Sequence, residues 1–301
     1  MEELIKVLEK TVSSSQGDQN ESTKFIQEYI QRDFTGFLQS LADVLFNQQN
    51  SPVVRAAAGL QLKSQLTARD ETSRYQQQER WRSLPEPTKL YIKERVFGAL
   101  GTEVFRPSSA PQCVAYIALI ELPGGQWPAL IPALASNVTN QQSTQQLRLA
   151  SLEAIGYICQ DIDNSVIKTT DLQLMLNAIV QYGLRDDEQD DVKRAATSAL
   201  LSISESKVHK ISKTHQSISF KDLGDYLNVA PQFAEKVVAQ MIREDRLQGY
   251  LNQLESMVYF ESKNVLQLFD DEILRMCSDV NDIIEKIQNV VPNEWWTMVT
   301  R

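Results

Sequence analysis

The sequence predicts a mainly α protein: a stack of paired helices, then a small α+β domain, then a long C-terminal helix. Three observations predict it. Apolar residues recur at helical spacing through residues 1–205, with turn signals between the runs. From residue 207, a short β-like segment, two amphipathic helices and a hairpin follow one another. Residues 263–295 return to apolar positions three and four apart, which is typical of a helix that packs on other helices.

The first segment contains one helical run after another. The runs are separated by short connectors that contain Pro or Gly, at 50–52, 84–87, 106–109 and 122–125. Strand-like alternation of apolar and polar residues is absent there. We expect about five helical pairs, over 2–31, 33–67, 86–121, 127–161 and 172–205.

A short motif repeats within these pairs. It has an aliphatic residue, a basic residue, any residue and two small residues, at 54–58, 147–151 and 192–196, with a weaker copy within 110–118. Small side chains let helices pack closely, and we expect the motif's own basic residues, Arg55 and Lys193, to be structural. A paired-helix unit of roughly 40–47 residues is typical of HEAT or armadillo repeats, so we expect an α-solenoid.

The α+β segment, 207–262, has the element order of a winged helix. We expect a strand at Ser217–Phe220, helices at 221–227 and 231–246, and a hairpin formed by 248–253 and 257–261. The following segment, 263–295, is predicted to be an assembly helix that pairs with itself or with partner helices. Its apolar residues are Leu266, Phe269, Ile273, Met276, Val280, Ile283, Ile287 and Val290.

Residues 1–205 resemble the N-terminal third of the importin-β family of nuclear transport receptors. The matching segments are Val7–Val12, Ala57–Lys63, Gly101–Glu103, Arg106–Ala110, Gln112–Ala115 and Leu152–Ile162. The resemblance implies that Lys63 and Arg69 bind the small GTPase Ran; for each residue alone, a solvated helix face is an equally good interpretation. It also implies contact with phenylalanine-glycine nucleoporins at Leu176, Asn177 and Val180, although half of that pocket would lie beyond residue 206. For these three residues we favour an ordinary place in the solenoid core.

Residues 207–295 resemble the C-terminal end of subunit four of the COP-nine signalosome, a PCI-domain protein. The resemblance rests on Ile218–Phe220, Leu223–Gly224, Ala234–Lys236, Ala239–Arg243, Arg246–Gly249 and Val258–Glu261. The sequence departs from this family where Asp245 replaces a usual glycine and Asn252 a usual aspartate, and the long helical arm before the winged helix is absent. The chain therefore looks like a fusion, natural or engineered, joined near 205–207.

Composition and side-chain chemistry favour a protein-binding function. The net charge of −9 argues against a nucleic-acid partner, and Glu235, Glu244 and Asp245 on the expected recognition helix would repel phosphate. Neither histidine, His209 or His215, has partners for a catalytic triad, so we expect no enzyme activity.

Ligands and membranes are likewise not expected. The acidic run 186–191 is interpreted as the start of a helix and not as a calcium site. The three cysteines, Cys113, Cys159 and Cys277, indicate neither a disulfide framework nor a metal site, and no cofactor is expected. No apolar run is long enough to insert into a membrane and no signal peptide is recognised, so we expect a protein of the cytoplasm and nucleus.

Two functions remain open. The chain is either a transport-receptor fragment that binds Ran and nucleoporins, or a non-catalytic protein that joins COP-nine signalosome subunits through its winged helix and C-terminal helix. The resemblance places the surface for importin-α in later repeats that this chain does not contain. We therefore do not expect cargo import, and identification of co-purifying proteins would separate the two functions.

Overall fold

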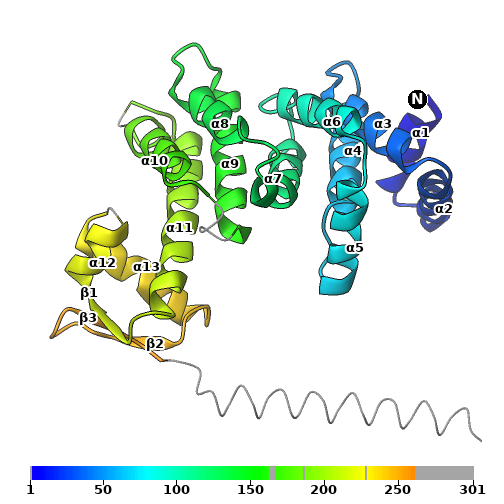
Figure 1. Cartoon of the computed structure of the whole chain (residues 1–301). Coiled ribbons are helices and arrows are strands. Elements are labelled where there is room, and N and C mark those ends of the chain that lie inside the picture. Colours follow the sequence, from blue (N-terminus) through cyan, green and yellow to red (C-terminus); the bar gives the residue numbers. More distant parts are fainter. Residues whose placement is uncertain (1, 163–166, 186, 228, 262–301) are drawn as a thin grey trace, which may run out of the picture. The chain divides into compact units, whose positions relative to one another are not determined.

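The computed structural model describes residues 2–162, 167–185, 187–227 and 229–261 (Figure 1). The chain divides into two compact units, Met1–Lys207 and Val208–Arg301, and each unit is described by itself. In the described residues, no helix is long and apolar enough to cross a membrane. The predicted assembly helix, with Leu266, Phe269, Ile273, Met276, Val280, Ile283 and Ile287, lies outside the described residues.

The first unit is a succession of helices. They are α1 (Glu2–Thr11), α2 (Gln16–Arg32), α3 (Phe34–Phe46), α4 (Pro52–Ser64), α5 (Glu71–Arg82), α6 (Glu86–Gly98), α7 (Ser109–Glu121), α8 (Leu130–Thr139), α9 (Gln145–Asp161), α10 (Thr169–Ala178) and α11 (Asp190–Ser212). A 3₁₀ turn, η1 (Leu122–Gly124), follows α7, and a π-helical turn, η2 (Ile179–Gly183), follows α10. Each of the five predicted pairs contains two of these helices. Helix α5 was not predicted.

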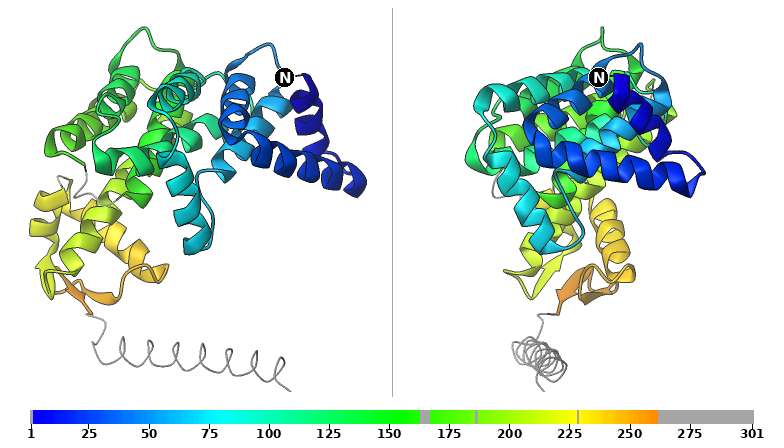
Figure 2. Two further views of the ribbon diagram at one scale, coloured as in Figure 1. Left: turned by 45° about the vertical axis from the view of Figure 1, so that its right-hand side comes forward. Right: turned by 90° about the vertical axis from the view of Figure 1, so that its right-hand side faces the viewer.

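Neighbouring pairs stack in two layers (Figure 2). Helix α3 packs on α6 in one layer, while α4 packs on α7 and α7 on α9 in the other. Helix α8 contacts both α9 and α10. This arrangement confirms the predicted HEAT-type solenoid, in which each pair covers the apolar face of the next.

Small residues bring the helices of this unit close together. Ala57 and Ala58 are buried in α4, and a Cβ atom added to Gly183 would lie 2.8 Å from the Cβ of Ala196 in α11. Glycine at 101 has a left-handed φ of 73° and lies against the backbone of Leu147, where a Cβ atom would lie 2.6 Å from the Leu147 Cα. The repeated small residues therefore serve close packing, as the motif predicted.

The motif's basic residues are structural in α4 and α9. Arg55 is 4% exposed; its Nε donates to the Leu45 carbonyl at 2.8 Å and another guanidinium nitrogen to the Thr102 carbonyl at 2.7 Å. Arg148 in α9 instead forms an ion pair, at 3.2 Å, with the carboxylate of Glu188, which precedes α11. Each arginine therefore ties its own repeat to the loop of the next one.

Helix α11 runs without interruption through the predicted join at 205–207, so the expected boundary lies inside one helix of 23 residues. Asp190 and Asp191 occupy its first turn, where negative charge favours the helix dipole. The acidic run therefore marks a helix start at these two residues, as predicted.

The second unit contains a three-stranded antiparallel sheet. Its elements are β1 (Ser217–Ser219), α12 (Phe220–Leu227), α13 (Pro231–Arg243), β2 (Gly249–Asn252) and β3 (Met257–Phe260), and the strand order is β1-β3-β2. Val258 and Phe260 on β3 are buried, as are Leu223 of α12 and Val237 of α13. This order of elements is that of the predicted winged helix.

Helix α13 ends at Arg243, three residues earlier than predicted. Asp245 has a left-handed φ of 55°, and the next amide, that of Arg246, donates to the Met241 carbonyl at 2.9 Å. Aspartate tolerates this backbone conformation better than most residues other than glycine. Asp245 therefore performs the helix-ending role for which a glycine is usual.

Candidate functional site

Lys63 and Arg69, the predicted Ran-binding residues, lie at the end of α4 and in the loop that follows it. Lys63 is half-buried, and its Nζ donates to Gln112 Oε1 at 2.7 Å. The same nitrogen lies 5.5 Å from the ring centroid of Tyr116 on α7, within the range of a cation–π contact. Arg69 is exposed.

Arg69 lines a hollow of about 550 Å³ that we name the basic hollow. Its wall combines the α4–α5 loop, α5, α7, η1 and the end of α9. The lining residues are Thr67, Ala68, Arg69, Arg74, Gln78, Tyr116, Leu119, Pro123, Asp161 and Ile162. Of the two predicted residues, Arg69 lines this hollow, and Lys63 lies beside it, over the ring of the lining residue Tyr116.

The electrostatics of the basic hollow favour an acidic partner. Arg69 and Arg74 are exposed cations, and Asp161 is the acidic residue of the lining. Partial burial raises the pKa of Asp161, against the opposing effect of Arg74. Burial and the neighbouring Asp161 also raise the pKa of Tyr116, so this hydroxyl stays protonated and can donate a hydrogen bond.

The residues predicted to contact nucleoporins lie on α10 and η2. Leu176 is half-buried, Asn177 is exposed and Val180 is 43% exposed. The favoured interpretation, a place in the solenoid core, is therefore wrong for Asn177 and Val180. Leu176 and Asn177 lie near the end of α10, and Val180 lies in the π-helical turn that begins at Ile179, where the regular α-helix ends.

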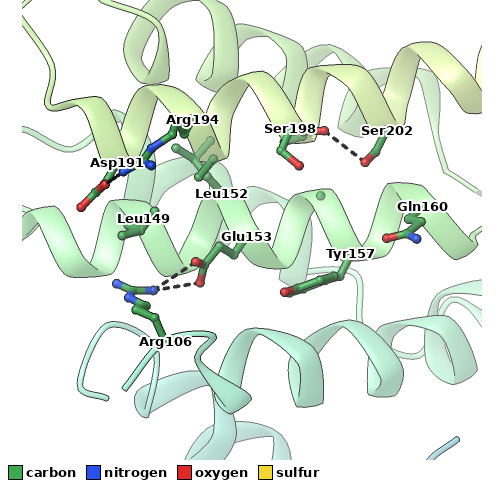
Figure 3. A pocket seen from close by; sticks show the side chains of 13 residues that line it. Arg106, Leu149, Leu152, Glu153, Tyr157, Gln160, Asp191, Arg194, Ser198 and Ser202 are labelled. Atoms are coloured by element: carbon green, nitrogen blue, oxygen red, sulfur yellow. Dashed lines mark hydrogen bonds and ion pairs between the residues drawn. The ribbon is translucent and has the colours of Figure 1, made fainter. Parts of the chain in front are cut away.

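A second hollow, the α9–α11 groove, was not predicted (Figure 3). It has a volume of about 440 Å³ and lies on two successive helices of the stack. Its lining consists of Arg106, Leu149, Leu152, Glu153, Gly156, Tyr157, Gln160, Asp191, Arg194, Ala195, Ser198, Ala199 and Ser202.

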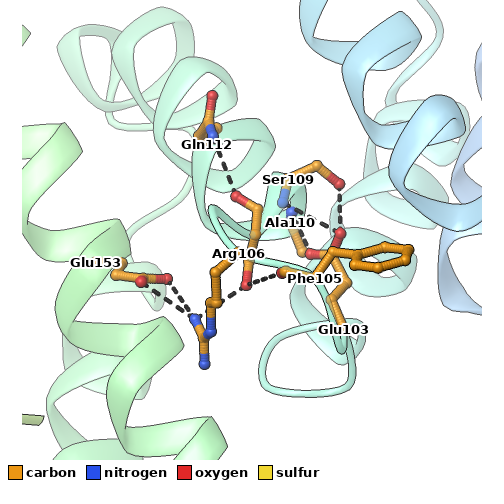
Figure 4. A network of polar contacts seen from close by, with 8 residues as sticks. Glu103, Phe105, Arg106, Ser109, Ala110, Gln112 and Glu153 are labelled. Carbon is orange, nitrogen blue, oxygen red and sulfur yellow. Dashed lines mark hydrogen bonds and ion pairs between the residues drawn. The ribbon is translucent and has the colours of Figure 1, made fainter. Parts of the chain in front are cut away.

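The loop between α6 and α7 contributes Arg106 to the lining of this groove, and Figure 4 shows the polar contacts of that loop. Glu103 holds the loop, since its carboxylate accepts from the Ser109 amide at 3.1 Å and from the Ala110 amide at 2.8 Å. Arg106 then reaches α9 and pairs with Glu153 at 3.0 Å. Burial raises the pKa of Glu153, and the Arg106 guanidinium opposes that shift.

Among residues 2–261 with the gaps given above, no three His, Cys, Asp or Glu side chains come together as ligands for an ion. His209 and His215, the two histidines of the sequence, are exposed near the end of α11 and in the turn after it.

Two family models match separate parts of the chain. The importin-beta N-terminal domain matches residues 23–102, and the PCI domain matches residues 188–262. The PCI match begins before α11, so it includes the start of this helix in addition to the predicted 207–262.

Curated relatives resemble the first unit. The chain is 34% identical over 194 residues to importin subunit beta-1 of Schizosaccharomyces pombe and 35% identical over 176 residues to that of Arabidopsis thaliana. These alignments cover 64% and 58% of this chain but only 22% and 20% of the relatives. The chain therefore spans about a fifth of the length of the curated relatives that it matches.

Solved structures of importin-beta share the fold. One crystal structure of importin beta gives a TM-score of 0.63 at 28% identity, over 75% of this chain and 25% of that chain. Kap95p bound to RanGDP gives 0.64, and the Kap95:Nup1 complex gives 0.62, both at 26% identity over 80% of this chain and 27% of theirs. An importin-β-like N-terminal region and a PCI region are thus combined in one chain.

Proposed function

We propose that this protein is a non-catalytic, importin-β-like binding protein that binds the small GTPase Ran at the basic hollow. The observation that carries the proposal is that Arg69 and Arg74 line one hollow together with Tyr116, and that the Lys63 ammonium lies over the Tyr116 ring. Similarity to importin subunit beta-1 and to a Kap95p structure whose partner is Ran supports it. The sites of action would be the cytoplasm and the nucleus.

Exposed cations at a hollow complement an acidic protein surface, and charge complementarity raises both specificity and the rate of association. The Lys63 ammonium is already held by Gln112 and Tyr116, so it is oriented before a partner arrives. Because the chain spans only about a fifth of the length of these relatives, we expect it to bind Ran more weakly than a full-length receptor.

Titration of Ran loaded with GTP into the whole chain tests the proposal. Replacing both residues, Lys63→Glu and Arg69→Glu, should weaken binding by about 1–3 kcal/mol. The control is Lys210→Glu, the same change of charge at an exposed residue of the second unit. Absence of binding by the unchanged chain at ~100 μM Ran, a concentration that detects even weak complexes, ends the proposal.

Nucleoporin binding is the second part of the proposal. Leu176 and Val180 are apolar residues that are incompletely buried, with the exposed Asn177 beside them, and a Kap95 structure similar to this chain is in complex with Nup1. Val180→Asp should reduce capture on a phenylalanine-glycine matrix, whereas Thr170→Asp at the exposed start of α10 should not. We do not expect import of a fused importin-β-binding segment in permeabilised cells; the chain should instead compete with the full receptor.

The PCI region supports a second candidate function, assembly with PCI-domain subunits such as those of the COP-nine signalosome. The observation that favours it is the match over residues 188–262, together with a sheet in which β2 is an edge strand. An edge strand offers unpaired backbone groups to another chain. Purification from cells separates the two candidates: signalosome subunits and cullins favour assembly, whereas Ran and nucleoporins favour transport.

A further inference from the structure

The two arginines that line the basic hollow lie on a segment whose middle contains no buried side chain. Arg69 precedes α5, and Arg74 lies in the first turn of this helix. The structure describes all of residues 67–80, and each of them is exposed or half-buried. The residues on either side, Leu66 and Trp81, are both 1% exposed. These two side chains therefore anchor the ends of the segment that carries the cations.

Trp81 anchors the C-terminal end of α5. It is the buried residue of this helix, and its indole Nε1 donates to Glu121 Oε1 at 2.9 Å. Lys93 Nζ donates to the other carboxylate oxygen at 2.7 Å, so the acceptor is itself held in place. A hydrogen bond to an ionised acceptor is stronger than one between neutral groups. The link from Trp81 to α7 therefore fixes the position of this end of α5.

Two further contacts of α5 lie nearer the surface. The guanidinium of Arg80, an exposed residue, lies 3.8 Å from the ring centroid of Phe34. Gln77 is half-buried, and its Nε2 donates to the Ser64 carbonyl at 2.8 Å. A cation–π contact at an exposed site is weaker than one that is desolvated. Trp81 is therefore the main anchor of α5 in the core.

Helix geometry transmits the position of Trp81 to the hollow. Arg74, Gln78 and Trp81 are spaced four and three residues apart, so they lie along one face of α5, and the first two line the hollow. At a rise of about 1.5 Å per residue, Arg74 lies about 10 Å along the helix axis from Trp81. A tilt of about 10° at Trp81 would therefore move Arg74 by about 2 Å, which is enough to break a hydrogen bond to a partner.

We propose that Trp81 is a positioning residue for partner binding at the basic hollow. Its hydrogen bond to Glu121 docks α5 on α7, and the docked helix presents Arg74 to the acidic surface of the partner. The inference rests on the proposed binding of Ran and adds how the site is held in its binding geometry. Because only the docked helix completes the hollow, the apparent Kd rises as the docked fraction falls. Lys63 lies on α4, so its contact does not depend on this docking.

Titration of Ran loaded with GTP into the whole chain measures the role of Trp81. Trp81→Phe keeps an aromatic ring in the core but removes the N–H donor. It should weaken binding about fivefold or more, the lower end of the usual coupling between two linked equilibria. Ile203→Ala is the control for lost stability, because Ile203 is buried in α11 and does not line the hollow. This control should leave the affinity for Ran unchanged while the chain is folded.

A double-mutant cycle separates positioning from a general loss of structure. In the unchanged chain, Arg74→Ala should weaken Ran binding about fivefold, the effect of one exposed charge pair. In the Trp81→Phe chain the same change should matter less than about twofold, because Arg74 is already displaced. Lys63→Ala should weaken binding equally in both chains. An equal effect of Arg74→Ala in both chains would overturn the proposal.

A matched pair of double variants tests the hydrogen bond without changing Trp81. Lys93→Met with Glu121→Gln keeps an oxygen acceptor for the indole, whereas Lys93→Met with Glu121→Leu removes it. Neither variant leaves a buried lysine charge unpaired. The first should bind Ran about fivefold more tightly than the second. Equal affinities, in chains that are both folded by circular dichroism, would refute the role of the hydrogen bond.

Hydrogen exchange followed by mass spectrometry observes the docking of α5 directly. Without Ran, the amides of α5 should exchange faster in Trp81→Phe than in the unchanged chain. Bound Ran should slow their exchange in the unchanged chain, because the coupling is reciprocal. Unaltered exchange of α5 in Trp81→Phe refutes the role of Trp81 even where Ran binds. Faster exchange in Trp81→Phe, in a chain that never binds Ran, instead overturns the proposed function and the assigned partner.

Discussion

The indole Nε1 of Trp81 donates a 2.9 Å hydrogen bond to Glu121 Oε1 and thereby ties α5 to the end of α7. The other carboxylate oxygen, Oε2, accepts from Lys93 Nζ of α6 at 2.7 Å. Glu121 is 0% exposed and Lys93 is 5% exposed, so both charges of this pair are buried. Three helices meet at one carboxylate.

Replacing Glu121 by Gln should lower the free energy of unfolding of the first unit by about 3–5 kcal/mol, because it leaves the Lys93 charge buried without its partner. The double variant Lys93→Met and Glu121→Gln should be more stable than the single one, since no unpaired charge remains. Urea unfolding followed by circular dichroism measures both. A single variant within about 0.5 kcal/mol of the unchanged chain, the range of ordinary surface substitutions, contradicts this account.

Arg55 should tolerate neither Met nor Lys. Met leaves the Leu45 and Thr102 carbonyls without their donor, which costs about 1–3 kcal/mol for each buried group that stays unsatisfied. Lys keeps the positive charge but lacks the planar guanidinium whose separate nitrogens donate to the two carbonyls. Arg82→Met, at an exposed ion pair with Glu79, is the control and should change stability little. Equal effects of the two Met variants on the thermal midpoint would rule out the structural role of Arg55.

The paired helices were predictable because their apolar residues bury one face. Helix α3 contributes six buried residues at helical spacing, among them Phe37 and Leu41. Helix α5 was not predicted because Trp81 is its only buried residue. Its remaining positions are polar or exposed, so they form no apolar pattern at helical spacing. Its position depends on a tertiary hydrogen bond to a residue 40 positions away, which no local pattern reveals.

The candidate sites, like the helices, were predictable only where a local sequence pattern or a resemblance marks the residues. Lys63 and Arg69 could be named from a family resemblance, but Arg74, Tyr116 and Asp161 reach the basic hollow from three further helices. The spacing of these three residues in the sequence does not predict that they line one hollow. The α9–α11 groove arises from the absence of side-chain bulk at Gly156 and Ala199, and small residues by themselves predict close packing rather than a binding site.

Two thiols should be unreactive in the folded chain. Cys113 and Cys159 are both 0% exposed, and burial raises the pKa of Cys113 far above its usual range and the pKa of Cys159 to about 12. The thiolate is the reactive form, so iodoacetamide at about pH 8, below both pKa values, should not modify them. Mass spectrometry of peptides after labelling, with and without denaturing urea, gives the answer. Rapid labelling of Cys159 in the folded chain would contradict the packing of α9.

The predicted assembly helix yields the last prediction, which rests on its sequence alone because residues 262–301 lie outside the described residues. Its apolar positions form one long stripe, and each large side chain that becomes buried contributes roughly 1.5–3 kcal/mol. The predicted partner is a second copy or a helical bundle of other subunits. Replacing Ile273 and Val280 by Asp should abolish that association.

The same double variant should leave the unfolding of the first unit unchanged, because this unit has a core of its own, with buried residues from Leu4 to Ile203. Matched changes at Asn281→Asp and Gln288→Glu, outside the apolar positions, provide the control for added negative charge. Light scattering of the full chain and of the fragment 207–301 measures the association. An alternative is that the segment folds back along the solenoid, which predicts a monomeric full chain, because only the full chain contains the solenoid. A strictly monomeric, folded fragment that also fails to capture signalosome subunits would therefore exclude assembly through this segment.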